Sequence, residues 1–290
     1  MSVLIRATNY ICGIVILLIA ISCQKETVHV PDNDAPIINN VPAIKIENYI
    51  NRIFIDLIGR EPFDSEMANE LQKLKEGNLS KESREILIEK LQTNTGFIEG
   101  DTSYAQAYHQ HLYNLAKIRC IEGASDAQIT EFINGSSDPA AIVRLQLVLS
   151  SRKDLQDGLI TYNEVLGRMV YNLIYDEINM NTFNFVNATF DNLLWRFPTN
   201  AEFQEGYEMV EYNNSATIFG QIGQNKTDYT NIISNSREIY EGMIIWVFQQ
   251  ILARPPSTEE TAALLEDFIN HKDIKTIQRQ IMVTDEYANF

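Results

Sequence analysis

The chain has 290 residues, of which 45% are hydrophobic, and it carries 39 acidic against 23 basic side chains, a formal net charge of −16. This apolar fraction indicates a folded globular body, because disordered chains are much poorer in hydrophobic residues. The negative charge argues against nucleic acids and anionic lipid surfaces as partners, since both are bound by basic surfaces.

Residues 1–22 predict an export signal. The single charged residue Arg6 precedes an apolar run from Tyr10 to Ile21. Twelve helical residues span about 18 Å, too short for a hydrocarbon core of about 30 Å. The run ends in Ala20-Ile21-Ser22-Cys23, which resembles a bacterial lipobox, and the resemblance implies that Cys23 is acylated (palmitate being one such chain) and becomes the mature N-terminus. An ordinary signal peptide with an incidental cysteine is the alternative.

The next three residues, Gln24, Lys25 and Glu26, resemble the surface-export signal of Bacteroidota lipoproteins, a Gln-Lys-acidic run. The resemblance implies a protein held in the outer membrane by acyl chains on Cys23, with its body facing the cell exterior. A generic polar spacer on a periplasm-facing lipoprotein is the alternative. Residues 23–43 are rich in Pro, Asn and Asp, and we interpret them as a lipid-anchored flexible tether, because three prolines in twelve residues disfavour a helix.

Cysteine usage excludes several kinds of site. Cys12 lies in the predicted signal and Cys23 would be lipidated, so only Cys120 remains. No disulfide can then form within the mature chain, and zinc sites of the Cys-x-x-Cys kind and haem attachment by Cys-x-x-Cys-His are excluded. We expect Cys120 to be a small buried side chain.

Residues 44–290 predict a helical body. Ile50, Ile53, Phe54, Leu57 and Ile58 fall at the spacing of one amphipathic helix face. That helix should end at Gly59-Arg60-Glu61-Pro62, because proline cannot continue it. A second helix is expected from about Asp64, which we expect to act as its N-cap, and a third over about 81–91.

The corner between the first two helices occurs three times in the chain. Segments beginning at Phe54, Phe190 and Phe248 align without gaps over thirteen positions. We expect the arginine to complement the carbonyls at a helix end, the proline to break the helix, and Ser or Thr with Glu to form capping boxes at 199/202 and 257/260. A catalytic use of the Arg/Glu pair is the weaker interpretation. The shared residues are Arg60, Pro62, Glu66, Arg196, Pro198, Glu202, Arg254, Pro256 and Glu260.

A third helix recurs as well, since the segment ending in Glu238-Ile239-Tyr240 has a counterpart ending in Asp285-Glu286-Tyr287. Ser125 with Gln128 suggests a degenerate cap in one further, worn unit. The predicted fold is therefore all-α, built from tandem irregular three-helix repeat units packed into a compact helical array. The predicted units are 44–100, 104–158, 162–236 and 237–290.

The corner at residues 55–62, Ile-Asp-Leu-Ile-Gly-Arg-Glu-Pro, resembles the Leu-Asp-Leu-x-Gly-x-x-Pro turn of a helical domain of unknown function found beside cytochromes in planctomycete surface proteins. Phe97 and Tyr104 fall where that domain has aromatic residues. The corner is also similar to the Leu-Leu-Gly-Arg-x-Pro turn of secreted and S-layer-like helical repeats. Both resemblances imply a fold and supply no catalytic residue, and a cytochrome role does not transfer without haem-binding cysteines.

No motif predicts a cofactor or metal. His109 and His111 point to different sides of a helix, and His29 and His271 have no partner in the sequence. A phosphate-binding loop, a nucleophile elbow and a dinucleotide fingerprint are absent. Trp195 and Trp246 are expected in the core. Residues 179–187, rich in Asn and aromatics, are interpreted as an inter-helix connection with its aromatics packed inward, a surface for a glycan or a partner loop being the alternative.

These observations predict a non-enzymatic outer-membrane lipoprotein that acts as an adaptor or accessory subunit of a cell-surface or outer-membrane protein assembly. Wide docking surfaces are typical of helical repeats, and anchoring raises effective concentration at the membrane. The alternative is a surface glycan-binding protein or a helical glycoside hydrolase in nutrient uptake, whose paired acids would come together only in the fold.

Overall fold

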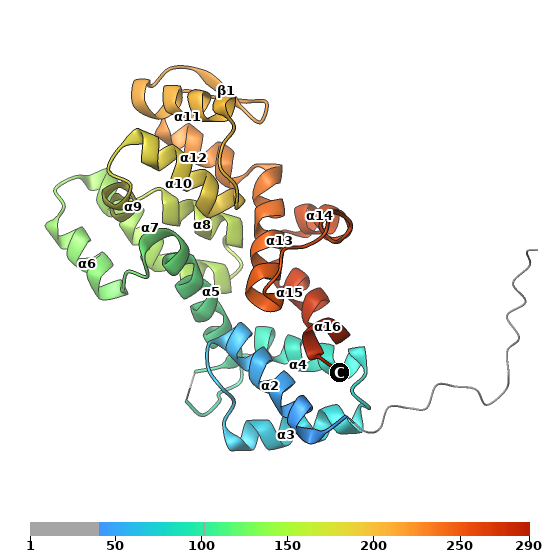
Figure 1. Ribbon diagram of the computed structural model, residues 1–290. Helices are drawn as coiled ribbons and strands as arrows, with labels where there is room; N and C mark the ends of the chain where they lie inside the picture. The colour runs from blue at the N-terminus through green and yellow to red at the C-terminus, as the bar shows by residue number, and fades with distance from the viewer. Residues whose placement is uncertain (1–40, 101) are drawn as a thin grey trace, which may run out of the picture. The chain divides into compact units, whose positions relative to one another are not determined.

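The computed structural model describes residues 41–100 and 102–290. The predicted signal, Cys23, the export signal 24–26 and the tether up to residue 40 therefore lie outside the described residues. The chain is mostly helical, at 73%, and forms a compact array of about 15 helices (Figure 1). This confirms the all-α prediction at the level of fold class. Within the described ranges, no helix is long and apolar enough to cross a membrane.

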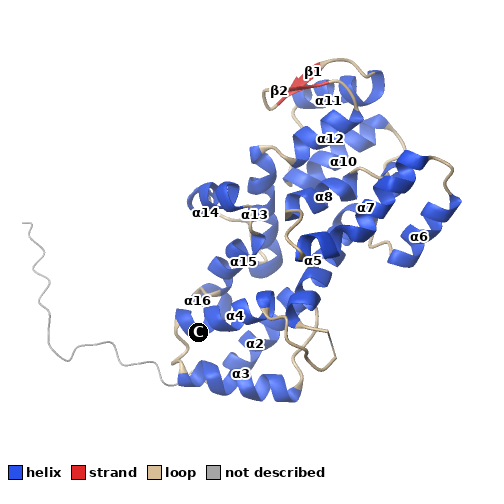
Figure 2. Ribbon diagram, turned by 180° about the vertical axis from the view of Figure 1, so that it is seen from behind, coloured by secondary structure: helices blue, strands red, loops and turns tan. Residues whose placement is uncertain are grey.

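The helices are α2 (Ala43–Ile58), α3 (Asp64–Glu76), α4 (Lys81–Thr93), α5 (Tyr104–Ile121), α6 (Asp126–Gly135), α7 (Pro139–Gln156), α8 (Tyr162–Val170), α9 (Leu173–Ile178), α10 (Thr182–Leu194), α11 (Asn200–Tyr212), α12 (Lys226–Ser234), α13 (Arg237–Leu252), α14 (Thr258–His271), α15 (Ile274–Met282) and α16 (Asp285–Ala288). One short hairpin, β1 (Ala216–Ile218) with β2 (Gln221–Gly223), is antiparallel and pairs Ala216 with Gly223. This hairpin was not predicted from the sequence, and it packs on α11 (Figure 2).

The first three helices follow the sequence pattern closely. The predicted stripe of α2 is buried, and the helix ends at Gly59, whose φ of 76° reverses the chain direction. Helix α3 begins at Asp64 and α4 covers 81–93. The predicted N-cap role of Asp64 is wrong, because Phe63 occupies that position and its N–H donates to Glu66 at 2.8 Å. Asp64 instead supplies negative charge to the first helical turn.

Two long helices connect the array. Helix α5 packs against α2, α4, α7 and α8, while α13 packs against α10, α14 and α15. The C-terminal helices return to the beginning of the body, where α15 contacts α4 and α16 contacts α2 (Figure 1). Tyr287 of α16 donates its hydroxyl to Asp56 of α2 at 2.8 Å, and Tyr49 of α2 donates to the Met282 carbonyl at 3.1 Å. The two ends of the body are thus joined by one buried and one partly buried hydrogen bond.

Two further sequence expectations concern the core. Cys120 is buried as expected, and its burial raises the pKa of the thiol to about 12, so it remains a protonated, unreactive side chain. Trp246 is also buried, and it stacks on Tyr162 with ring centroids 5.4 Å apart. Trp195 is half-buried and lies 6.1 Å from Trp246 between ring centroids. Both tryptophans therefore pack with other core aromatics.

The interpretation of residues 179–187 as a connection is wrong. Asn181 caps α10, and the helix begins at Thr182 in the middle of that segment. Asn side chains suit such a cap because they accept backbone N–H groups, as Asn181 does from Asn184 at 2.9 Å. Only part of the aromatic content points inward, since Phe185 is buried whereas Phe183 is exposed.

Candidate functional site

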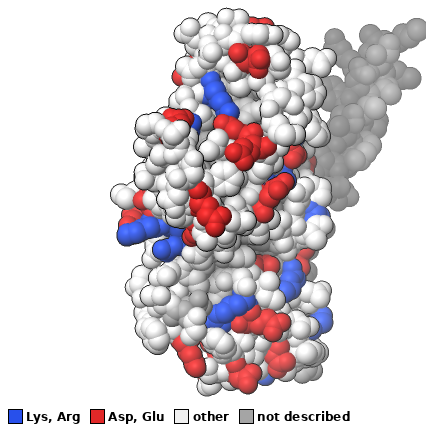
Figure 3. Space-filling model, turned by 90° about the vertical axis from the view of Figure 1, so that its left-hand side faces the viewer, with Lys and Arg blue, Asp and Glu red and all other residues white. Residues whose placement is uncertain are grey.

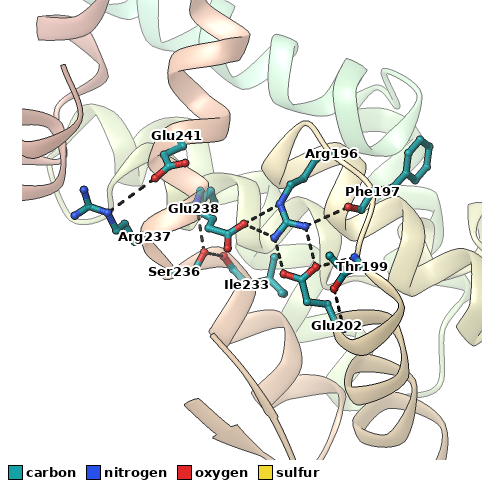
Figure 4. Close-up of polar contacts among 10 residues, drawn as sticks. Arg196, Phe197, Thr199, Glu202, Ile233, Ser236, Arg237, Glu238 and Glu241 are labelled. Carbon is teal, nitrogen blue, oxygen red and sulfur yellow. Dashed lines mark hydrogen bonds and ion pairs between the residues drawn. The ribbon is translucent and has the colours of Figure 1, made fainter. Parts of the chain in front are cut away.

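The corner between α10 and α11 is held by one arginine. Arg196 donates from Nη1 and Nη2 to the two carboxylate oxygens of Glu202, at 2.9 and 2.6 Å, and from Nη1 to the Phe197 carbonyl at 3.1 Å (Figure 4). The same carboxylate accepts the backbone N–H of Thr199 at 2.7 Å, and the Thr199 hydroxyl accepts from the Glu202 N–H. The predicted capping box is confirmed. The expected contact of the arginine with carbonyls of the helix end is wrong here, because Arg196 lies beyond the C-cap of α10 and its carbonyl partner is Phe197 in the turn.

The other two corners have the same geometry. Arg60 contacts both carboxylate oxygens of Glu66 at 2.7 and 2.9 Å, and Arg254 contacts those of Glu260 at 2.8 and 2.7 Å. Each arginine also donates to the carbonyl of the following residue, at 2.9 and 3.1 Å. The Ser257–Glu260 capping box is confirmed. Pro62, Pro198 and Pro256 each directly precede the N-cap residue of the second helix.

The residue before each arginine adopts a left-handed backbone. Gly59, Trp195 and Ala253 have φ values of 76°, 54° and 54°. This conformation ends the first helix, and only glycine adopts it without steric cost. At two of the three corners, a residue other than glycine therefore adopts an unfavourable backbone conformation, which the surrounding contacts maintain.

A second carboxylate reaches two of the arginines from the first turn of a later helix. Arg196 Nε donates to Glu238 of α13 at 2.8 Å, and Arg254 contacts Glu286 of α16 at 2.6 and 2.7 Å. Glu238 and Glu286 each lie two residues after the N-cap of their helix, Ser236 and Thr284. This shared position is visible in the sequence, but it does not reveal which arginine the carboxylate reaches. At the first corner, the Tyr104 hydroxyl of α5 donates to Glu66 at 2.6 Å.

These contacts keep the corner carboxylates ionised. The hydrogen bonds from Arg196 lower the pKa of Glu202 to about 2, and those from Arg254 lower the pKa of Glu260 to about 2. Burial opposes ionisation of Glu66, but hydrogen bonds from Arg60, Tyr104 and the Phe63 N–H outweigh it and lower its pKa as well. A carboxylate that stays ionised at neutral pH cannot act as a general acid. The geometry thus supports a structural role for the predicted corner residues.

The two neighbouring histidines occupy different environments, as their spacing predicted. His109 is buried, its Nδ1 lies 2.5 Å from the Ala105 carbonyl, and burial lowers its pKa to about 4. His111 lies against Gly59, where an added Cβ would come within 2.7 Å of the imidazole Nδ1. Within the described ranges, no group of three metal-ligating side chains is assembled.

His111 also lines a cavity of about 170 Å³ enclosed by α2, α5, α13 and α15. Its other polar lining groups include Asp56, Gln250 and Gln278, and burial raises the pKa of Asp56 while lowering that of His111. Small-molecule sites usually start near 300 Å³, so the cavity is small for a saccharide. It contains one carboxylate, whereas glycoside hydrolysis requires a pair.

A row of aromatic side chains crosses α10 and α11. Phe183 lies 5.1 Å from Phe203, Phe203 lies 5.7 Å from Tyr207, and Tyr207 lies 5.8 Å from Tyr212, measured between ring centroids. Phe183 is 61% and Tyr212 58% exposed, while the two middle rings are half-buried. We call these four residues the aromatic row. Its first member, Phe183, belongs to the Asn- and aromatic-rich segment 179–187, which the sequence did not predict to be helical.

Comparisons with known proteins add no assignment: no protein-family model, no curated protein and no solved structure matches this chain.

Proposed function

We propose that this protein is an outer-membrane lipoprotein, anchored through acyl chains on Cys23, that serves as a non-enzymatic adaptor or accessory subunit of a cell-surface or outer-membrane assembly. The observation that carries the proposal is the apolar run of residues 10–21 followed directly by Ser22-Cys23 and the polar run Gln24-Lys25-Glu26. Residues 23–43 form the tether, and the body faces the cell exterior.

The helical body supports a binding role over a catalytic one. Its most repeated polar feature, the Arg–Glu corner, uses its charged groups to fix one helix against the next. The Arg196 and Arg254 guanidinium groups each contact two carboxylates and a carbonyl. Groups occupied in this way stabilise the relative orientation of helices, which is what a docking scaffold requires.

We further propose that the body consists of tandem three-helix units near 44–100, 104–158, 162–236 and 237–290. Three corners of equal geometry support the arrangement, and so does the confirmed cap formed by Ser125 and Gln128 in the worn unit. Glu238 adds a detail, because it lies in the first turn of α13 and bonds Arg196 of the preceding unit. Helix α13 would then close one unit and open the next.

Lipid anchoring is tested with Cys23→Ser. The variant should lose metabolic labelling with palmitate and leave the membrane fraction, because Cys23 supplies the acylated sulfur. Cys120→Ser is the matched control and should keep both properties, since Cys120 is buried in the body. Continued membrane residence of the Cys23→Ser variant would refute the anchor. Protease added to intact cells should cleave the wild-type body, and full protection would place it on the periplasmic face.

The adaptor role is tested by affinity purification of the full-length protein from detergent-solubilised outer membranes. Recovery of a membrane barrel or surface protein in stoichiometric amount is expected. A protein purified alone that binds polysaccharide would support the alternative, a glycan-binding protein or glycoside hydrolase in nutrient uptake. Release of reducing sugar from that polysaccharide would separate the hydrolase from the binding protein.

A further inference from the structure

The aromatic row leaves apolar side chains exposed on the helix pair α10 and α11. Phe183 and Tyr212 at its two ends are more than half exposed, and Met180, just before α10, is exposed as well. Exposed aromatic groups at this density mark interaction sites, because leaving them in water costs free energy that a partner recovers. No hydrogen bond occupies the hydroxyl of Tyr207 or Tyr212 within the described residues, so both are available to a partner.

The chain segment that carries the row is rich in acidic side chains, although Lys226, which follows it directly, pairs with Asp176. Residues 169–225 contain seven acidic side chains and one basic one, Arg196, which Glu202 and Glu238 already bind. Glu211 lies next to the row, because it directly precedes Tyr212 and its carboxylate accepts a hydrogen bond from the hydroxyl of Thr182, which directly precedes Phe183. Burial and the charge of Glu211 raise the pKa of Tyr207. Glu205, Glu208 and Glu211 form no ion pair within the described ranges. Figure 3 shows, in the upper part of one face, large uncharged areas with red groups and few blue ones.

The orientation of the rings helps identify the occupant. Neighbouring rings of the row are inclined by 61°, 39° and 63°, so they do not form the flat, coplanar platform on which successive sugar rings would stack. Inclined rings beside carboxylates instead suit a cation, which the ring faces attract and the carboxylates neutralise.

We propose that the aromatic row and Glu211 bind a segment of a partner protein that carries Lys or Arg side chains between apolar residues. The inference rests on the proposed adaptor function and assigns its docking face to α10 and α11. Aromatic rings provide the central contact area, and the acidic surroundings attract and orient the basic segment.

The test uses the full-length protein in detergent and a fluorescent peptide of alternating Lys and Leu as the probe, with an alternating Glu and Leu peptide and a neutral glucan hexasaccharide in parallel. The Lys peptide should bind, and its binding should weaken as salt rises. Phe183→Ala combined with Tyr212→Ala should weaken it about tenfold, and Glu211→Gln about threefold. Matched controls are Phe97→Ala and Glu89→Gln, both at exposed positions outside the row, which should bind like wild type.

Melting curves of each variant verify that the fold is intact, which is expected because the mutated side chains are exposed. The inference is overturned if the Lys peptide fails to bind, if the double variant binds within twofold of wild type, or if the controls weaken binding equally. It is also overturned if the hexasaccharide binds to the row in place of the peptide. Affinity purification distinguishes failure of this inference from failure of the adaptor function. If the double variant recovers a partner as well as wild type does, only the docking face on α10 and α11 is refuted. If wild type recovers no partner, the adaptor function itself is refuted.

Discussion

Replacing the corner arginine with alanine, one corner at a time, should destabilise the body in the order of burial. The arginine and glutamate side chains are 22% and 12% exposed at Arg60, 34% and 19% at Arg196, and 35% each at Arg254. Exposed ion pairs contribute at most about 1 kcal/mol, whereas breaking a buried pair costs about 3–5 kcal/mol. We therefore expect losses of about 3, 2 and 1 kcal/mol in the free energy of unfolding at Arg60, Arg196 and Arg254.

Urea denaturation followed by far-ultraviolet circular dichroism measures the three losses in the full-length protein. Arg237→Ala is the matched control, because its partner Glu266 is 69% exposed and the pair should contribute less than about 0.5 kcal/mol. Equal losses at all three corners, or the largest loss at Arg254, would refute the argument that burial determines the strength of this shared contact.

Two further predictions concern the backbone and a buried histidine. Ala253→Gly should stabilise the body by about 0.5 kcal/mol, because the relief of left-handed backbone strain exceeds the entropy that glycine adds to the unfolded chain. Gly59→Ala should destabilise the body by about 2 kcal/mol, because it introduces the same strain and its Cβ meets His111. Thermal melts of both variants check this pair, and a stabilised Gly59→Ala variant would contradict it. His109 is buried in its neutral form with a pKa of about 4, so the unfolded chain binds its proton first as pH falls. The free energy of unfolding should therefore decrease by about 3 kcal/mol as the pH falls from above 6.5 to about 4. The urea midpoint should depend less on pH in His109→Gln than in wild type. An equal pH dependence in the two proteins would refute the role of His109.

The corners were predictable from the sequence because their contacts are local. Arg196 and Glu202 are six residues apart, and the proline and the capping residue between them fix the turn that brings them together. The left-handed conformation of Trp195 had no such signal, since tryptophan has no preference for it and the tertiary contacts of the ring hold it there. The N-cap of α3 was predicted at Asp64 because phenylalanine has no side-chain oxygen that can cap a helix. Phe63 takes that position nonetheless, because the Glu66 carboxylate accepts its backbone N–H.

The aromatic row shows where local pattern is insufficient. Phe183 and Phe203 lie on different helices, and their contact depends on how α10 and α11 pack after the corner between them. The Asn-rich composition around residue 181 suggested a loop, yet the same side-chain chemistry caps a helix. Which aromatic residues face water was decided by the packing of neighbouring helices.

The sequence by itself determined the helical class, the end of the first helix, the approximate starts of the next two and the recurring Arg–Pro–Glu corner, because periodicity and capping act over a few residues. The lipid anchor at Cys23 and the export signal remain predictions from the sequence. Only the tertiary structure decided that Tyr287 closes the body onto Asp56 and that Glu238 and Glu286 complete the corners. These contacts join segments 32 to 231 residues apart, and such distances are set by the packing of the whole core, which no local pattern encodes.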